Sequence, residues 1–236
     1  MVGEDRADPL DQQRRAAAQQ AVTWVRDGMV LGFGTGRAAG HALEAIAHRR
    51  RTEGLRISGV PSSRATEERA RALELPLTTL EAHPELDLTI DGADEVNPAR
   101  HMLKGAGGAL LREKVLAAAS HRLLIVVERV KLVPHLGATR GVPLEVLPFA
   151  APACLLQLRA LGGTPLLRHG ADGSPAVNDN GHWVVDCDFE RGLFADLPAL
   201  DQRLRSVPGI LETGLFWSFQ PVVFVGGPEG VETLGA

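Results

Sequence analysis

The first half of the chain alternates between short continuous apolar runs and stretches in which apolar residues recur at helical spacing. Continuous apolar runs are typical of strands buried on both faces, and helical recurrence indicates amphipathic helices. The pattern therefore predicts an α/β fold with a doubly wound, mostly parallel sheet. The expected strands are 29–33, 55–60, 86–90 and 123–127, and the expected helices are 9–27, with Asp8 as N-cap and Pro9 in the first turn, 38–48, 63–73 and 109–119.

After about Gly137 the pattern changes to shorter strands and a polar connection over 169–182. This segment predicts a smaller α+β unit of ferredoxin-like type that contains a hairpin. The apolar run 221–225 is again typical of a buried strand, and its return to the first sheet would make the smaller unit an insertion. We therefore expect residues 1–137 plus 212–236 to form a Rossmann-like domain and residues 138–211 the smaller one. The smaller unit has expected strands at 142–146, 164–167 and 183–187, and expected helices at 151–161 and 197–205.

The composition of the 236-residue chain is that of an ordinary globular protein, with 44% hydrophobic residues and a net charge of −4. The mild acidic balance argues against a nucleic-acid partner, which usually requires a basic face. No apolar run approaches the ~20 residues that span a bilayer, so no membrane partner is expected. Cys154 and Cys187 form neither a disulfide framework nor a zinc motif, and a cytoplasmic location is expected.

The basic residues are distributed unevenly between their two types. Of 25 basic residues only three are lysine, Lys104, Lys114 and Lys131, and all three fall within one short stretch. Coding bias explains the arginine excess equally well, so the clustering alone carries no function. The observation gains weight only from the motifs that surround it.

Three segments after predicted strands carry candidate chemistry. Gly32–Arg37 (GFGTGR) precedes a helix, so its backbone N–H groups and Arg37 can hold an anion; the alternative is a tight turn without a ligand. Asp87–Glu95 (DLTIDGADE) brings carboxylates to the strand's carboxyl end, where they can bind hydroxyls or a metal; the alternative is a helix cap with a solvated turn. Lys104–Lys114 (KGAGGALLREK) joins a lysine, a glycine loop and Glu113; the alternative is an exposed glutamate.

Taken together, these segments resemble the ribose-5-phosphate isomerase type A family over nearly the whole chain. DGADE and the lysine–glycine loop with its following REK are the most specific of the shared motifs. The similar stretches are GFGTG (32–36), GVPSS with Thr66 (59–66), DLTIDGADEV (87–96), LKGAGGALLREK (103–114), ERVKLVPHLG (128–137), PLEVLPFA (143–150), NDNGHWVVDCDF (178–189) and PGILETGLF (208–216).

The resemblance implies an aldose–ketose isomerase that interconverts D-ribose 5-phosphate and D-ribulose 5-phosphate through an enediolate, in the non-oxidative pentose phosphate pathway, without cofactor or metal. It implies that Glu113 is the base that moves a proton between C2 and C1, that Asp91 assists ring opening, and that Lys104 stabilises the enediolate oxygen. It also implies a homodimer or larger assembly. The substrate-binding residues that it implies are Thr35, Gly36, Arg37, Ala38, Asp91, Gly92, Ala93, Asp94, Lys104, Gly105, Ala106, Gly107 and Lys131, with a weaker indication for Arg14, where relatives often carry lysine.

Two departures from the family pattern leave alternatives open. The first loop has Arg37-Ala38 where the family has Ser-Thr, and the second has Ala106 where the family has glycine. One alternative is therefore an isomerase for another aldose or aldose phosphate. A second is a non-catalytic sugar-phosphate sensor, although only one helix precedes the first strand and no helix-turn-helix is evident. A coenzyme A transferase would need its own glutamate motif, which the sequence does not show.

Overall fold

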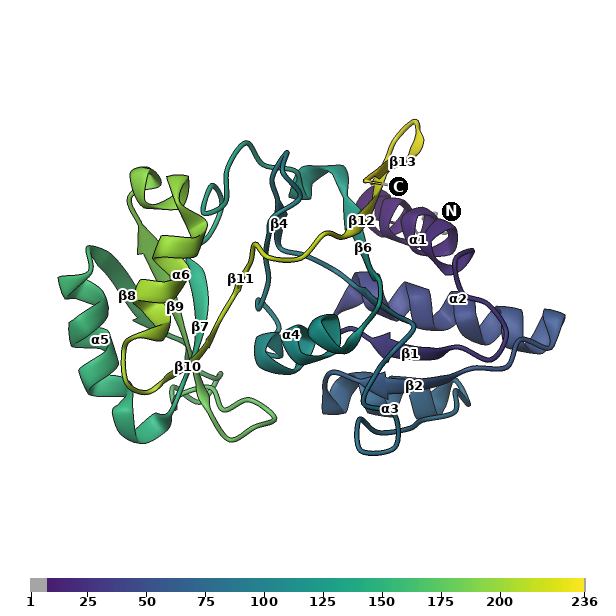
Figure 1. Cartoon of the computed structure of the whole chain (residues 1–236), viewed down its shortest axis with the longest axis horizontal. Coiled ribbons are helices and arrows are strands. Elements are labelled where there is room, and N and C mark those ends of the chain that lie inside the picture. Colours follow the sequence, from purple (N-terminus) through teal and green to yellow (C-terminus); the bar gives the residue numbers. More distant parts are fainter. Residues whose placement is uncertain (1–7, 236) are drawn as a thin grey trace, which may run out of the picture.

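The computed structural model describes residues 8–235, which form six α-helices, three short 3₁₀ helices and thirteen strands (Figure 1). The α-helices are α1 (Pro9–Val22), α2 (Arg37–Glu53), α3 (Arg64–Ala72), α4 (Leu110–Ala119), α5 (Ala151–Ala160) and α6 (Leu197–Arg205), and the 3₁₀ helices are η1 (Arg129–Lys131), η2 (Pro148–Ala150) and η3 (Arg191–Ala195). The strands are β1 (Val30–Phe33), β2 (Ser58–Pro61), β3 (Leu88–Asp91), β4 (Glu95–Val96), β5 (Met102–Leu103), β6 (Leu123–Glu128), β7 (Val142–Val146), β8 (Gly163–Leu167), β9 (Trp183–Phe189), β10 (Ile210–Thr213), β11 (Leu215–Phe216), β12 (Val222–Gly227) and β13 (Gly230–Leu234).

The main sheet has six strands in the order β13-β12-β6-β3-β1-β2, and every neighbouring pair is parallel except β12 with β13. The five parallel strands are β1, β2, β3, β6 and β12 in chain order. If they are counted from one to five in that order, their arrangement across the sheet is 2-1-3-4-5, which is that of a doubly wound fold. The order reverses between β1 and β3, because the chain leaves β1 for β2 on one side and returns to β3 on the other. Ligands bind such sheets at this reversal, outside the carboxyl ends of the strands.

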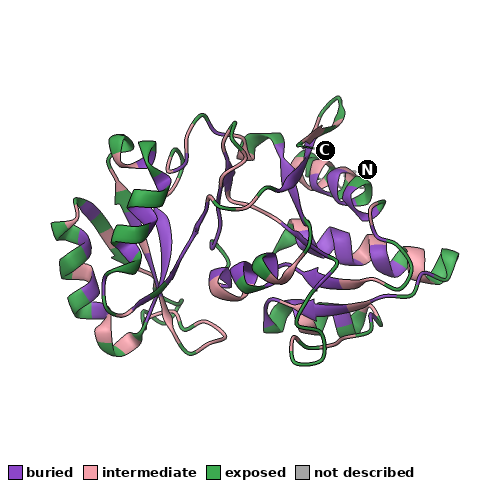
Figure 2. Cartoon of the chain, viewed as in Figure 1, coloured by how far each residue is buried: buried purple, intermediate pink, exposed green. Residues whose placement is uncertain are grey.

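Different elements cover the two faces of the main sheet. Helices α1 and α2 pack against each other on one face, over a core that includes Phe33 and Phe224. The opposite face contributes Ile125 and Val223 to a core shared with Ala117 of α4. Figure 2 shows the inner strands of the main sheet buried, and the outward helix surfaces and the edge strand β13 exposed. Burial on both faces explains why these strands are continuous apolar runs in the sequence.

The smaller unit has the element order β7-α5-β8-β9-α6-β10 and an antiparallel sheet in the order β10-β7-β9-β8. This is the ferredoxin-like arrangement, so the predicted fold class is confirmed for both units. Its core lies between the sheet and both helices and includes Leu144, Val185, Leu158 and Leu204.

A third, three-stranded sheet in the order β11-β5-β4 connects the two units, and the sequence did not predict it because each strand has only two residues. Helix α4 lies between the units and contacts β3 of the main sheet together with β7 and β10 of the smaller one (Figure 1). The helix that carries Glu113 therefore touches both units. We propose the division at 137/138 as predicted, and the second division after Thr213, because β10 extends across 211/212.

Most predicted elements are present, with shifted ends. Strand 142–146 and helix 197–205 have the predicted bounds, and the side chain of Asp8 caps α1 by accepting from the N–H of Leu10. Helix α1 ends earlier than predicted, at Val22, and α2 continues to Glu53, where Gly54 adopts a left-handed conformation. Both cysteines are buried free thiols. Over residues 8–235, none of the helices is both long and apolar enough to cross a bilayer.

Candidate active site

The turns that follow β1 and β3 meet where the strand order reverses. The two strands pair up to Phe33 and Ile90, and the N–H of Gly34 donates to the carbonyl of Ile90 over 3.0 Å. A Cβ at Gly34 would lie 2.2 Å from the carboxyl group of Asp91, so only glycine allows the turns to approach this closely. Gly36, at a φ of +97°, caps α2 without a side-chain hydrogen bond.

A cavity of about 300 Å³ lies at this point, between the carboxyl edge of the main sheet and the turn 105–107. Cations outnumber carboxylates in its lining. Such a cavity beside a helix N-terminus suits a small anionic ligand. The charged lining residues are Arg14, Arg37, Lys104, Lys131 and Arg140 with Asp94, Glu113 and Glu128, and the others are Gly36, Ala38, Gly92, Ala93, Gly105, Ala106, Gly107 and Val126.

Lys104 lies between two buried carboxyl groups. Its Nζ is 3.0 Å from Oδ2 of Asp91 and 3.2 Å from Oε2 of Glu113, and it donates to the carbonyl of Gly92 over 2.5 Å. The side chains of Lys104, Asp91 and Glu113 are 4%, 1% and 5% exposed. Oδ1 of Asp91 accepts from the N–H groups of Thr35 and Gly92. One ammonium group thus serves two carboxyls that have lost almost all contact with water.

This burial changes the ionisation of both carboxyl groups. Burial raises the pKa of Glu113 to about 8; the charge of Asp91 adds to the rise and the Lys104 ammonium opposes it. Burial likewise raises the pKa of Asp91, against the attraction of Lys104. For Lys104, burial favours the neutral form, but the two carboxyls outweigh it and raise its pKa. A carboxyl with a pKa near 8 can accept a proton and return it near neutral pH.

The turn 105–107 is held from both units. Oδ2 of Asp94 accepts from the N–H of Ala106 over 2.8 Å. The guanidinium of Arg168, from the smaller unit, donates to the carbonyls of Gly105 and Ala106 over 2.9 Å each, and both oxygens of Asp186 fix that guanidinium. The turn is therefore fixed in place before any ligand binds.

The backbone conformation of this turn explains why alanine is tolerated at position 106, where the family has glycine. Gly105 has a φ of +119°, whereas the only non-glycine residues at positive φ within 8–235 are Glu74 and Arg100. Ala106 therefore takes the place of a glycine without backbone strain. Because its N–H is engaged by Asp94, the turn amides without a partner among the described residues are those of Gly105 and Gly107.

Arg14 of α1 supplies a buried cation at another part of the cavity. Its Nη2 donates to Oε1 of Glu128 over 2.8 Å, while Nη1 makes no hydrogen bond and lies 3.7 Å from Oδ1 of Asp11. Lys131 and the first turn of α2 line the same cavity. A guanidinium with one unsatisfied edge suits a phosphate group.

The structure brings most of the predicted site residues together. Glu113 and the thirteen residues predicted to bind substrate make fourteen, and of these only Thr35 and Asp91 lie outside the lining of the cavity. The Oγ1 of Thr35 lies 2.7 Å from Ser62 Oγ and 2.9 Å from Ser63 Oγ, so its hydroxyl supports the turn behind the cavity. Asp91 lies beneath Lys104. Sequence reasoning missed Glu128, the last residue of β6, and Arg140, whose Nη1 lies 3.1 Å from Oδ1 of Asp94. Glu128 begins the similar stretch 128–137 but was assigned no role, and Arg140 lies outside every such stretch.

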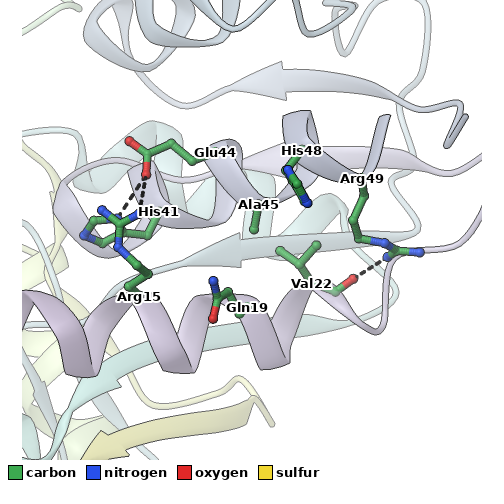
Figure 3. A pocket seen from close by; sticks show the side chains of 8 residues that line it. All are labelled: Arg15, Gln19, Val22, His41, Glu44, Ala45, His48 and Arg49. Carbon is green, nitrogen blue, oxygen red and sulfur yellow. Dashed lines mark hydrogen bonds and ion pairs between the residues drawn. The ribbon is translucent and has the colours of Figure 1, made fainter. Parts of the chain in front are cut away.

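A second cavity, of about 400 Å³, lies between α1 and α2 (Figure 3). The ring of His41 lies 2.8 Å from Asp11 and 3.3 Å from Glu44, and Arg49 donates to the carbonyl of Val22 over 2.8 Å. Its charged groups are thus already paired within the protein, and it has neither a glycine turn nor a buried base beside a lysine. The cavity at the reversal of strand order is the better candidate.

The fold and this cavity define an α/β protein with a ferredoxin-like unit and a cavity whose cationic lining suits a small anionic molecule. Comparison with known proteins narrows this class. The family model described as ribose 5-phosphate isomerase A (phosphoriboisomerase A) matches residues 58–230. The chain is 44% identical over 225 residues to a ribose-5-phosphate isomerase A of Synechococcus sp. (strain JA-3-3Ab), covering 95% of this chain and 97% of the relative.

Other relatives agree. A ribose-5-phosphate isomerase A of Roseiflexus castenholzii is 42% identical over 94% of each chain. The ribose 5-phosphate isomerase A structure from Methanocaldococcus jannaschii superposes with a TM-score of 0.91 at 32% identity, over 96% of this chain and 99% of the other. A D-ribose-5-phosphate isomerase in complex with phospho-erythronic acid gives 0.92 at 30% identity, with the same coverage. The chain belongs to the ribose-5-phosphate isomerase A family, as the sequence motifs predicted.

Proposed function

We propose that this protein interconverts D-ribose 5-phosphate and D-ribulose 5-phosphate, a step of the non-oxidative pentose phosphate pathway. The observation that carries the proposal is the buried Glu113 carboxyl, with a pKa of about 8, 3.2 Å from the ammonium of Lys104 at the wall of a cationic cavity. Membership of the isomerase family supports it. One carboxyl group that accepts and returns a proton is what an aldose–ketose isomerisation requires.

In this mechanism the Glu113 carboxylate removes the proton from C2 of the open-chain aldose, and the electrons of that C–H bond form the enediolate. The same carboxyl then delivers the proton to C1, while the O2 hydroxyl proton is lost and O1 gains one, which gives the ketose. The Lys104 ammonium and the N–H groups of Gly105 and Gly107 stabilise the negative oxygen of the enediolate. Asp94 binds sugar hydroxyls.

Asp91 takes a role different from the predicted one in this proposal. It lies beneath Lys104 and accepts two backbone N–H bonds, so it holds the ammonium in position without touching the sugar. Arg14, Lys131 and the backbone N–H groups of the first turn of α2 bind the 5-phosphate, and the side chains of Arg37 and Ala38 lie at the edge of that subsite.

The alternative substrate, another aldose or aldose phosphate, is motivated by Arg37 and Ala38, which stand where the family has hydroxyl side chains. Kinetics on ribose 5-phosphate, other pentose phosphates and free pentoses decide between them. Efficient turnover of another sugar beside negligible turnover of ribose 5-phosphate would reject the proposal. A non-catalytic sensor has no role for a base with a raised pKa, and it turns over no sugar. Measurable turnover of any of these sugars therefore rejects that alternative.

We also propose that the protein acts as a homodimer or larger homo-oligomer in the cytoplasm. The family resemblance supports an oligomer. Two free buried thiols are compatible with a reducing compartment. Light scattering coupled to gel filtration measures the assembly, and a monomer at micromolar concentration contradicts it.

A further inference from the structure

Lys114 directly follows Glu113 on α4 but does not line the cavity. Its Nζ donates to Oε1 of Glu212 over 2.8 Å, to the carbonyl of Thr213 over 2.6 Å and to the carbonyl of Leu215 over 2.9 Å. An ammonium group has three N–H donors, so each has a partner. The side chain is only 11% exposed, which makes this a buried and fully satisfied lysine.

The two carbonyls that Lys114 binds flank Gly214, and Gly214 binds Lys104. The carbonyl of Gly214 accepts from the backbone N–H of Lys104 over 2.9 Å, and its N–H donates to the carbonyl of Pro143 over 2.7 Å. A Cβ at Gly214 would lie 2.3 Å from the carbonyl oxygen of Lys104. The segment 213–215 is therefore packed tightly against the main chain of Lys104, and Lys114 holds both of its ends.

Phe216 provides a second connection between the two lysines. Its ring is completely buried, and its centroid lies 4.6 Å from Nζ of Lys114 and 5.5 Å from Nζ of Lys104. Both ammonium groups lie within the range of a cation–π interaction with the same ring. Movement of the segment 213–216 would thus alter the backbone of Lys104 and the surface behind its side chain.

We propose that Lys114 is a positioning residue, which holds the segment 213–216 so that the Lys104 ammonium lies against Glu113. The kinetic part of this inference rests on the proposed function. An arginine could not reproduce the arrangement, because a planar guanidinium is larger than an ammonium and cannot aim three donors at one carboxylate and two carbonyls from a single atom. This requirement accounts for a lysine at a buried position in a chain that otherwise favours arginine.

The smaller unit takes part through Glu212, which lies on β10. Arg205 of α6 also donates to Glu212 and pairs with Asp201, and Asp201 accepts from the hydroxyl of Thr213. Removal of Lys114 alone therefore leaves Glu212 with Arg205 as a partner. That single cation would then face the two carboxylates of Glu212 and Asp201, whereas a variant that also neutralises Glu212 leaves one cation with one carboxylate, which limits the loss of folding stability.

The test compares Glu212→Gln with the double variant Lys114→Met/Glu212→Gln in the full-length protein. In the double variant we expect kcat for ribose 5-phosphate to fall about 10- to 100-fold relative to Glu212→Gln, with KM changed less than about threefold, because a catalytic group is displaced while the substrate contacts remain. The acid limb of the kcat/KM profile should move to higher pH. Asp91, Asp94 and Lys104 face Glu113, and of these only Lys104 lowers its pKa.

Glu212→Gln itself should keep the wild-type kcat and acid limb, since Lys114 retains both carbonyls. If the double variant matches Glu212→Gln in kcat and acid limb, and differs only in melting temperature, the proposal is wrong and Lys114 is merely structural. If the double variant does not fold, Gly214→Ala tests the same segment. Its Cβ pushes against Lys104 with Lys114 intact, so the same kcat loss and pH shift are expected, and wild-type behaviour overturns the proposal.

A crystal structure of the double variant separates this inference from the proposed function. The Nζ–Oε2 distance between Lys104 and Glu113, 3.2 Å in the native protein, should lengthen. If the wild-type protein fails to isomerise ribose 5-phosphate, the proposed function fails, but this distance still tests the inference. An unchanged distance in a folded double variant overturns the role of Lys114 whatever the substrate is.

Discussion

Nζ of Lys104 lies 3.2 Å from Oε2 of Glu113, and both side chains are almost completely buried. The same ammonium lies 3.0 Å from Asp91, so two carboxyls share one positive charge. Desolvation raises the pKa of Glu113 more than the attraction of the single ammonium lowers it, so this pKa is raised to about 8. The pair is suited to moving a proton, and its properties can be measured.

The first prediction concerns pH. The base acts as a carboxylate, and a raised pKa means that it is protonated and inactive on the acid side. We expect kcat/KM for ribose 5-phosphate to increase with pH along an acid limb with a midpoint near 8. Initial rates between pH 5.5 and 9.5 at constant ionic strength measure the limb. A profile that is flat below pH 7 would contradict the assigned ionisation.

The second prediction is that Glu113→Gln folds normally but loses roughly 10²-fold or more of kcat, the scale for removal of a general base. The glutamine keeps the volume and the hydrogen-bonding capacity but accepts no proton. A circular dichroism spectrum like that of the wild type serves as the folding control. Near-normal turnover would reject Glu113 as the base.

The same variant makes a prediction about stability. The pKa of Glu113 is about 8 in the folded protein and has its usual value of 4.5 in the unfolded chain. Between these two pH values the carboxyl group is protonated in the folded protein and ionised in the unfolded chain. The contribution of Glu113 to stability is therefore fully present below pH 4.5 and is lost as the pH rises toward 8. Glutamine has no such dependence, so Tm of the variant minus Tm of the wild type should increase across this range. A constant difference would contradict the raised pKa.

A further prediction follows from the position of Lys104. Lys104→Met removes the charge that lowers the pKa of Glu113, so the acid limb should move above the wild-type midpoint. It also removes the enediolate contact, and kcat should fall about 10²-fold or more, the scale for loss of one oxyanion donor. The pH profile of the residual activity measures the shift. A lower kcat with an unmoved acid limb would show that Lys104 stabilises the intermediate without tuning the base.

The residues that gather at the candidate site were predictable because most of them belong to dense local motifs. Lys104 and Glu113 are nine positions apart in one glycine-rich segment, and Asp94 lies in an acidic cluster after a strand. The parallel sheet was equally predictable, since β6 has six residues and all of them except the final Glu128 are apolar. Local patterns of this kind need no knowledge of distant contacts.

The missed features depend on contacts between distant segments. Arg14 pairs with Glu128 across 114 positions, and only the packing of α1 beside β6 brings them together. The sequence could not show that Thr35 would turn its hydroxyl toward Ser62, or that Lys114 would bind carbonyls about 100 positions away. Strand β13 lacks a strong apolar pattern because it is an exposed edge strand.

The departure at the first loop gives another prediction. Arg37 is exposed at the first position of α2, and its side chain makes no hydrogen bond within residues 8–235. Replacement by the family's hydroxyl pair, Arg37→Ser with Ala38→Thr, should leave KM for ribose 5-phosphate unchanged or lower, because the proposed function assigns the phosphate to backbone N–H groups, Lys131 and Arg14. Steady-state kinetics at fixed ionic strength measure KM. A large rise would show that Arg37 itself holds the phosphate.

Loss of Arg14 should raise KM for ribose 5-phosphate, unlike loss of Arg37, because Arg14 is 3% exposed and its Nη1 makes no hydrogen bond. Arg14→Met would strand the buried carboxylate of Glu128, so the informative variant is Arg14→Met/Glu128→Gln, with Glu128→Gln as its control. A hydrogen bond from a charged group is worth about 1.5–3 kcal/mol, so KM for ribose 5-phosphate should rise about 10- to 100-fold relative to the control. The low turnover of unphosphorylated ribose should change little, because that sugar lacks the group that Arg14 binds. Equal losses on both sugars would place Arg14 in the support of the fold instead of the phosphate subsite.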